Sequence, residues 1–511
     1  MDTFAHLATG FTVAFRIENL VVALLGSFIG TIVGMLPGLG PINGVAILLP
    51  LAFALKLPPE TALILLAAVY MGCEYGGRIS SILLNVPGDA GAIMTALDGN
   101  PMAKQGKAGV ALSMSAWASF VGSTIAILGL ILFAPLLANW SLAFGPAEYF
   151  ALMIFAFACL AGMVGDQPLK TVLASLIGLF MAVVGVDSNS GVYRFTFDSI
   201  HLSDGIQFIA VVIGFFSVSE VLLMLEHTQR GGKIVKQTGR LLFNMKEFMM
   251  TIGTVLRSSV MGFFIGVLPG AGATVASAMA YMTTKRMHEK EGRFGDGDIR
   301  GVAAPEAANN ASACGSFVPM LTLGIPGSGT TAVMVGALSL YNITPGPLLF
   351  TQQPEIVWGL IAALLLANVM LLVMNIPLVG VFSRMLSMPN FVLVPGIAAV
   401  STVGVYAVHS TSFDLVLMVG LGVFGYLLRK MNFPMSSLIL GFVLGEMLEQ
   451  NLRRALSISN GEIGILFESP ITIGLWVLAV AMLVIPPLLR RRKTAPAVKA
   501  VEVAATEAST A

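Results

Sequence analysis

Long apolar runs recur along almost the whole chain, with short polar stretches between them. A helix that spans a bilayer needs about 20 apolar residues. Because the runs are continuous rather than alternating, they favour helices over strands. The pattern predicts an all-α polytopic membrane protein with about 12 membrane segments. The candidate spans are 20–36, 116–138, 146–165, 168–186, 206–225, 252–282, 357–380, 391–408, 413–428, 434–450 and 472–489. Shorter or interrupted stretches, expected to form half-helices or re-entrant segments, are 44–56, 61–73 and 318–340.

Composition supports a protein built for lipid. Only 11% of the residues are charged, whereas a soluble domain carries about 25%, and the mean hydropathy is +0.88. The net charge of +1 provides no general attraction to nucleic acid. The three cysteines and five histidines show neither a disulfide framework nor the spacing of metal ligands. We therefore expect no cofactor other than a coupling ion.

Helix-breaking motifs interrupt the apolar runs, and each occurs twice. GMLPGLGP at 34–41 returns as GVLPGAGA at 266–273, 232 positions later. Internal repetition of this kind indicates two related halves. In both copies the preceding small residues are spaced by four, which places them on one helix face. Such stripes mainly allow close packing of membrane helices.

A second pair of breaks follows the first. NVPGDAGAIM begins at Asn85 and GIPGSGTTAV at Gly324, 239 positions later. The second copy has therefore gained seven residues, which fall within the charged stretch 285–300. Matched interruptions in two halves are the strongest pointer in a sequence to the binding site of a secondary transporter. A plain kink or an interhelical loop is the alternative reading of each single break.

Loop charges predict the orientation of the halves by the positive-inside rule. The basic loop 226–246 and the basic residues 429–430 are expected in the cytoplasm, and the acidic loop 186–205 outside. The halves are then related by inverted topology. Arg453 and Arg454 disagree with the rule, and the balanced charges of 285–300 leave that loop unplaced.

The predicted organisation follows from these features. No Lys or Arg precedes Arg16, so the first helix is expected to remain in the membrane rather than to be cleaved as a signal peptide. The parts are membrane repeat 1 at 18–225, a basic cytoplasmic linker at 226–250, membrane repeat 2 at 251–450, a loop and final helix at 451–489, and a disordered tail at 490–511.

The breaks create a place for charged ligands. A helix that begins after a break directs bare N–H groups and partial positive charge at its surroundings, which suits an anion such as a carboxylate. Carbonyl groups before the break suit a cation such as Na⁺. Hydroxyl and amide side chains bind either without the desolvation cost of a full charge. The candidate substrate-binding residues are Gly38, Gly40, Asn43, Gly270, Gly272, Thr274, Gly327, Ser328, Gly329, Thr330 and Thr331.

A second set near the same breaks is suited to a coupling ion or a gate. Arg78 is included because a guanidinium group fits a carboxylate. It could instead lie at the membrane interface with Glu74 and Asp89 and face water. The candidates for coupling-ion binding or gating are Asn85, Gly88, Asp89, Asn309, Asn310 and Arg78.

Enzyme functions find no support in the sequence. There is no GxxxxGK[ST] sequence that would bind ATP, no full dinucleotide fingerprint, and neither HExxH nor GxSxG. The chain is expected not to be an enzyme. An ion channel, which also uses broken helices and backbone ligands, and a non-transporting membrane scaffold or receptor remain alternatives.

The sequence resembles the large membrane subunit of the tripartite tricarboxylate transporters of bacteria, over about residues 18–490. The resemblance rests on four long blocks: GMLPGLGPINGVAILLPL, YGGRISSILLNVPGDAGAIMTALDGNPMAKQGKAG, GVLPGAGATVASAMAY and NNASACGSFVPMLTLGIPGSGTTAVMVGAL. It implies a permease of the bacterial inner membrane with a small four-helix membrane subunit and a periplasmic solute-binding protein as partners. It also implies uptake of tricarboxylates such as citrate, or of related acids, driven by a Na⁺ or H⁺ gradient.

Overall fold

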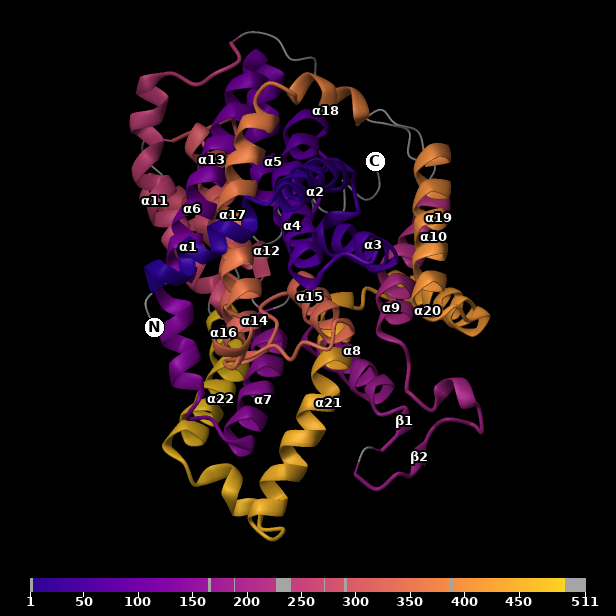
Figure 1. Cartoon of the computed structure of the whole chain (residues 1–511). Coiled ribbons are helices and arrows are strands. Elements are labelled where there is room, and N and C mark those ends of the chain that lie inside the picture. Colours follow the sequence, from indigo (N-terminus) through magenta and orange to yellow (C-terminus); the bar gives the residue numbers. More distant parts are fainter. Residues whose placement is uncertain are drawn as a thin grey trace.

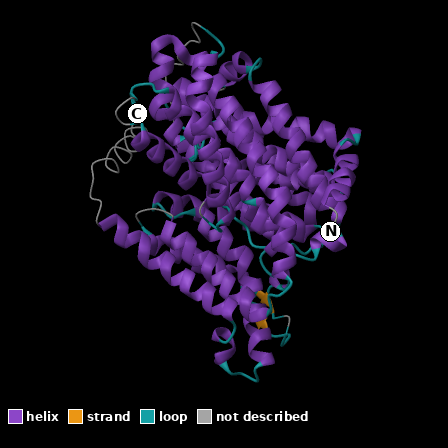
Figure 2. Cartoon of the chain, turned by 90° about the vertical axis from the view of Figure 1, so that its left-hand side faces the viewer, coloured by secondary structure: helices purple, strands orange, loops and turns teal. Residues whose placement is uncertain are grey.

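The described part of the chain is almost entirely helical (Figure 2). The computed structural model describes residues 3–163, 167–187, 189–226, 240–270, 272–288, 292–386 and 390–491. Within these ranges the strands are limited to β1 (Gly185–Val186) and β2 (Tyr193–Arg194), which pair antiparallel. The prediction of an all-α polytopic membrane fold is confirmed. Residues 227–239, which make up most of the basic loop 226–246, lie outside the described residues, and so does the tail from 492.

The helices follow one another in the order shown in Figure 1. Their bounds are α1 (Thr3–Ala14), α2 (Ile17–Met35), α3 (Gly40–Ala54), α4 (Pro59–Leu84), α5 (Ile93–Met102), α6 (Ala108–Ser141), α7 (Pro146–Met163), α8 (Pro168–Ala182), α9 (Phe208–Val212), α10 (Ser219–Glu226), α11 (Met245–Val267), α12 (Gly272–Met287), α13 (Ile299–Gly315), α14 (Phe317–Leu323), α15 (Gly329–Leu340), α16 (Leu349–Gln352), α17 (Pro354–Asn375), α18 (Val379–Met385), α19 (Asn390–His409), α20 (Ser412–Lys430), α21 (Met435–Ile458) and α22 (Pro470–Arg491). Wider π-helical turns join α5 to α6 at Ala103–Lys107 and α9 to α10 at Ile213–Val218.

Eight helices of the described chain are long and apolar enough to cross a membrane, and five shorter apolar helices accompany them. One predicted segment needs correction. The stretch 61–73 is not a half-helix, because it belongs to α4, which continues to Leu84 and is buried from Thr61 to Leu83. The stretch 252–282 contains the predicted break and divides there into α11 and α12. The predicted span 434–450 lies in α21, which is not among the eight.

The small-residue stripes pack helices together, as the sequence predicts. A Cβ on Gly34 of α2 would lie 2.1 Å from the Cys73 carbonyl oxygen of α4, and one on Gly266 of α11 would lie 2.2 Å from the Ser312 carbonyl oxygen of α13. Only a residue without a side chain allows backbones to approach this closely. The two packed pairs, α2 with α4 and α11 with α13, therefore correspond across the halves.

The helix breaks also correspond in backbone geometry. Gly38 and Gly40 have φ values of 87° and 60°, and Gly270 and Gly272 have 79° and 65°. Asn85 and Gly324, which end α4 and α14, are both left-handed, with φ of 60° and 70°. These positions lie at the offsets of 232 and 239 found in the sequence. The repeat is thus present in local structure, while the inverted orientation and the domain boundaries stay predictions.

A separate group formed by α7, α8, α21 and α22 extends away from the body of the molecule (Figure 1). On it, Arg453 lies 3.2 Å from Asp187 and 2.6 Å from Glu449, and Arg194 lies 2.6 Å from Glu449. Hydrogen bonds from Ser190 and the Asn189 N–H, together with Arg453, hold the pKa of Asp187 below its usual value. The loop 186–205 and Arg453 therefore lie on the same side of the molecule. These ion pairs account for the position of Arg453, which disagrees with the positive-inside rule.

The charged stretch 285–300, which loop charges left unplaced, packs onto α5. Asp98 is fully buried, and its Oδ1 accepts the N–H groups of Gly295, Gly297 and Asp298 at 2.8, 3.0 and 2.9 Å. Its Oδ2 accepts the Tyr281 hydroxyl at 2.9 Å. One carboxylate thus fixes the described part of this loop, 292–298, beside α5.

Replacing Asp98 with alanine is expected to release this loop. Hydrogen bonds to a charged group contribute about 1.5–3 kcal/mol each, so the loss lowers the thermal unfolding midpoint and exposes Arg293 to trypsin. Limited proteolysis of the purified chain measures the effect. Gln105→Ala serves as the control, because exposed Gln105 gives the loop one hydrogen bond, to the Asp296 carbonyl. Equal cleavage of the two variants would show that Asp98 does not hold the loop.

Candidate functional site

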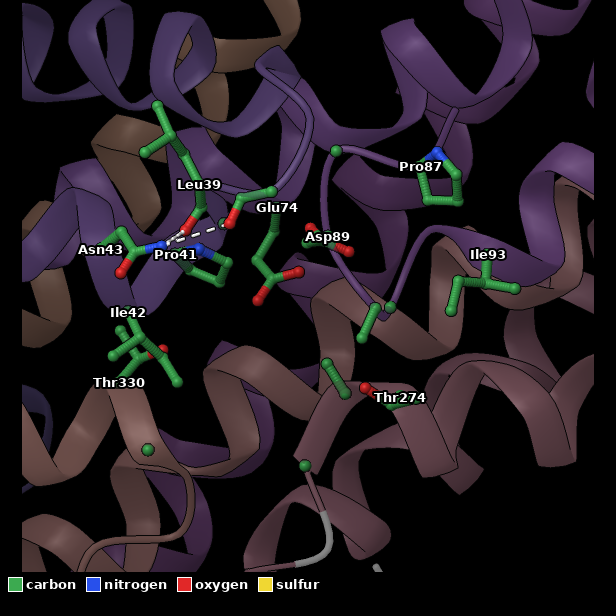
Figure 3. Close-up of a pocket in the computed structure, with 18 of the residues that line it drawn as sticks. Leu39, Pro41, Ile42, Asn43, Glu74, Pro87, Asp89, Ile93, Thr274 and Thr330 are labelled. Atoms are coloured by element: carbon green, nitrogen blue, oxygen red, sulfur yellow. Dashed lines mark hydrogen bonds between the residues drawn. The ribbon is translucent and has the colours of Figure 1, made fainter. Parts of the chain in front are cut away.

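All four helix breaks meet at one cavity of about 1200 Å³. Figure 3 shows its wall, with Glu74 extending between the first break, at Pro41 and Asn43, and Asp89 of the third break. The first residues of α3, α12 and α15 line the cavity, and so does Ile93, the first residue of α5. Four helix N-termini from both halves therefore contribute partial positive charge to one space.

The first break is shaped by its own residues. After α2 the chain becomes extended at Leu36, and Pro41 then lies in the first turn of α3, where its missing N–H is harmless. The amide nitrogen of Asn43 donates to the Gly38 and Leu39 carbonyl groups. Its Oδ1 is buried and has no hydrogen-bond partner. The two hydrogen bonds of the amide nitrogen therefore leave the Oδ1 atom of Asn43 available to a ligand.

The fourth break, residues 324–330, carries hydroxyl groups, and we call it the hydroxyl turn. Ser328 and Thr331 cap α15 reciprocally: the Thr331 N–H donates to Ser328 Oγ at 3.2 Å, and the Ser328 N–H donates to Thr331 Oγ1 at 2.8 Å. The hydroxyl of Tyr70, from α4, lies 3.3 Å from Ser328 Oγ. The Gly327 carbonyl accepts the Gly270 N–H at 2.9 Å, which ties this turn to the second break.

The third break, residues 85–91, carries Asp89, and Glu74 of α4 lines the same cavity; we call the break together with Glu74 the acidic turn. Asp89 Oδ1 accepts the Ala92 N–H at 2.8 Å, whereas its Oδ2 is buried and has no hydrogen-bond partner among the described residues. Glu74, which is 2% exposed, accepts a hydrogen bond at Oε2 from Asn309 of α13 at 2.8 Å. A helix of each half therefore contributes to this turn.

The two turns occupy corresponding places in the halves. Asp89 and Ser328 lie 239 positions apart, and each accepts the N–H three residues further on. Tyr70 and Asn309 also lie 239 apart, and each reaches across to the turn of the other half. Glu74 has Ala313 as its counterpart. The same geometry thus carries two chemistries: hydroxyl donors at one turn and acidic oxygens at the other.

Behind the cavity lies a buried polar network that does not line it. Arg78, 1% exposed, donates to Ser119 Oγ at 3.1 Å and to Asn375 Oδ1 at 3.4 Å. Ser119 donates to Glu306 at 3.0 Å and accepts the Asn310 amide at 2.9 Å. The expectation that Arg78 could face water at the interface is wrong, because it lies inside the helix bundle.

An ion pair in the cavity wall was not predicted. Arg429 of α20 binds Glu220 of α10, and both line the cavity. Glu220 Oε1 lies 2.7 Å from the point that a Cβ would occupy on Gly38, so the pair adjoins the first break. The available signal was Glu220 itself, a carboxyl group within the apolar run 206–225.

Most of the predicted site residues line the cavity. These are Gly38, Gly40, Asn43, Asn85, Gly88, Asp89, Gly270, Gly272, Thr274, Ser328, Gly329 and Thr330. Five do not line it: Gly327, Thr331, Asn309, Asn310 and Arg78. Asn309 nevertheless reaches the site through Glu74, whereas Thr331 is engaged in the cap of α15. Within the described chain, no group of three or more His, Cys, Asp or Glu is placed to hold a metal ion.

A helical membrane protein with paired helix breaks around one cavity has the architecture of a secondary transporter. The profile of the Tripartite tricarboxylate transporter TctA family matches residues 20–440. The chain belongs to this family and is the large subunit of a tripartite tricarboxylate transporter.

Two proteins from Agrobacterium vitis are similar in sequence to this chain. The chain is 39% identical over 495 residues to an uncharacterized 52.8 kDa protein in the TAR-I ttuC' 3' region, covering 96% of this chain and 98% of the relative. It is 40% identical over 234 residues to an uncharacterized protein in the TAR-II ttuC' 3' region, covering 45% of this chain and 97% of the relative. No solved structure matches the chain.

Proposed function

We propose that the chain imports carboxylates, namely tricarboxylates such as citrate or related di- and monocarboxylates, across the bacterial inner membrane. The observation that carries this proposal is the convergence of four helix N-termini on one cavity. Their N–H groups and partial positive charges favour an anion. At the hydroxyl turn, Ser328, Thr330 and Tyr70 add donors that suit carboxylate oxygens.

The proposed mechanism is alternating access coupled to a Na⁺ or H⁺ gradient. Irregular backbone at membrane depth is tolerated where it lines a cavity, and such a cavity lies between the moving parts of secondary transporters. The proposed partners are a small four-helix membrane subunit and a periplasmic solute-binding protein, in keeping with a family described as tripartite. The binding protein would capture the acid and deliver it to this chain.

Filling the cavity at Gly272 tests the proposal. Gly272 has φ of 65°, so any side chain there meets the same backbone strain, but no atom lies within 4 Å of the position that a Cβ would occupy. Gly272→Ala is therefore a matched control for Gly272→Leu, which adds bulk toward the ligand space. We expect Gly272→Leu to lose at least tenfold more uptake than Gly272→Ala. Uptake of radiolabelled citrate, succinate and benzoate is measured in cells that express the chain with its partners.

Three outcomes would count against the proposal. Equal uptake by the two Gly272 variants, at equal amounts of inserted protein, would show that the cavity does not hold substrate. Solute movement that never exceeds the equilibrium distribution would indicate a channel. The third outcome concerns the acids that the partner binding protein captures. If their uptake is unchanged after deletion of the chain, the chain is a scaffold or receptor.

A further inference from the structure

The acidic turn differs from the hydroxyl turn in charge although the two correspond in position. Where the second half has Ala313 and Ser328, the first half has Glu74 and Asp89. Neither carboxyl group lies within 4.0 Å of a Lys or Arg nitrogen in the described chain. Two carboxyl groups without a basic partner in a largely apolar setting are costly unless a cation compensates them.

Oxygen atoms of Asn309 and Asp89 lie beside the backbone at Gly91 and Gly77. Asn309 Oδ1 lies 2.2 Å, and Asp89 Oδ1 lies 3.2 Å, from the position that a Cβ would occupy on Gly91. Asp89 Oδ2 lies 2.6 Å from the corresponding position on Gly77. Glycine at both positions allows these oxygens to approach the backbone, and any side chain there would displace them.

The orientation of Asn309 is fixed by its neighbour. The side chain is fully buried, and its amide nitrogen donates to Glu74 Oε2, because an ionised carboxylate accepts hydrogen bonds and cannot donate them. The amide oxygen must then face the Gly91 side, where it has no hydrogen-bond partner. A buried, unpartnered amide oxygen cannot take up a proton at ordinary pH, but it coordinates a hard cation well.

We propose that Glu74, Asp89 and Asn309 bind one sodium ion in the acidic turn, in the wall of the cavity assigned to the carboxylate. This inference rests on the proposed function for its role in coupling, but the ion site stands on its own geometry. Two carboxyl groups and an amide oxygen match the oxygen ligands of a hard cation. The hydroxyl turn, with its neutral donors, then remains for the anion.

The proposed site gives a physical reason for coupling. A carboxylate that enters the cavity meets Glu74 and Asp89 in its wall, and like charges repel at short range. A bound sodium ion reduces that repulsion and so raises the affinity for the acid. By linkage, the acid raises the affinity for sodium by the same factor.

The site is tested on the purified full-length chain without substrate. The thermal unfolding midpoint is followed as NaCl replaces choline chloride at constant ionic strength, with KCl in parallel. A ligand that binds only the folded state stabilises it saturably, so we expect a saturable rise in NaCl. Asn309→Ala and Glu74→Gln should abolish this rise.

Asp98→Ala is the matched control, because it removes another buried carboxyl group, on α5, that does not line the cavity. It should lower the midpoint in both salts and retain the sodium-dependent rise. A rise absent in the unmodified chain, equal in KCl, or retained in Asn309→Ala would overturn the proposal. A rise that follows pH alone would assign the turn to a proton and overturn it also.

The outcome is separable from that of the proposed function. A sodium-dependent rise without uptake of any tested acid would support the ion site and contradict carboxylate import. Uptake that is lost in Gly272→Leu, together with no sodium effect on the midpoint, would support import and contradict the ion site.

Discussion

A leucine at Gly34 is expected to prevent the chain from reaching its folded state. The Cβ of any residue there would lie 2.1 Å from the Cys73 carbonyl oxygen and 2.4 Å from Cys73 Cα. Both atoms belong to the backbone of α4, which is buried on all sides and cannot shift locally. Overpacking a core typically costs about 1–3 kcal/mol. We expect the cost of a side chain at Gly34 to lie at or above the upper end of that range, because the clash is with the backbone of a second spanning helix.

The measurement is the amount of monodisperse chain recovered after mild detergent extraction. Gly253→Leu is the matched control, since Gly253 lies on α11 with φ in the ordinary range and no atom within 4 Å of its Cβ position. We expect normal recovery for Gly253→Leu and at least a tenfold loss for Gly34→Leu. Recovery of Gly34→Leu at the control level would mean that α2 and α4 do not pack as closely as described.

The breaks and their meeting place could be predicted from sequence because their causes are local. Proline removes a backbone donor, and glycine permits the left-handed backbone that Gly38 and Gly270 adopt. Repetition at fixed offsets then showed that both halves contribute. Twelve of the predicted residues line the cavity for this reason, although their part in binding stays a prediction.

The charged wall of the cavity could not be predicted, because it depends on packing between distant helices. Glu220 and Arg429 are 209 positions apart and meet only when α10 packs on α20. By the positive-inside rule, Arg429 is predicted only as a cytoplasmic residue at a helix end, because loop charge carries no information about packing against α10. Tyr70 was missed because its contact with Ser328 likewise spans the two halves.

Hydropathy also underestimated α4, for a physical reason. Glu74 and Arg78 interrupt the apolar run and made 61–73 look like a short segment. In the structure α4 packs against other helices and against the cavity, and polar partners such as Asn309 and Ser119 form hydrogen bonds with the two charged side chains. A helix that contacts protein rather than lipid need not be uniformly apolar.

Replacing Arg429 with glutamine is expected to reduce carboxylate uptake by about ten- to a hundredfold. Arg429 is the one basic side chain among the described residues that line the cavity. It is bound to Glu220, and a substrate carboxylate can exchange with Glu220 as its partner. A hydrogen bond to a charged group contributes about 1.5–3 kcal/mol, and about 1.4 kcal/mol is tenfold in affinity. The loss should appear mainly as a raised KM for the acid.

A second variant separates a binding role from a structural one. Arg429→Gln alone leaves Glu220 buried without its arginine, which destabilises the fold on its own. The double variant Arg429→Gln/Glu220→Gln removes both charges at nearly equal volume, so it should fold and still fail to transport. Lys430→Gln is the control, because Lys430 is paired with Glu226 on the exposed side of the same helix turn and does not line the cavity. The double variant has no cationic side chain in the described cavity wall. Normal uptake by this variant would therefore show that the acid does not bind Arg429, and that the ion pair only holds α10 against α20.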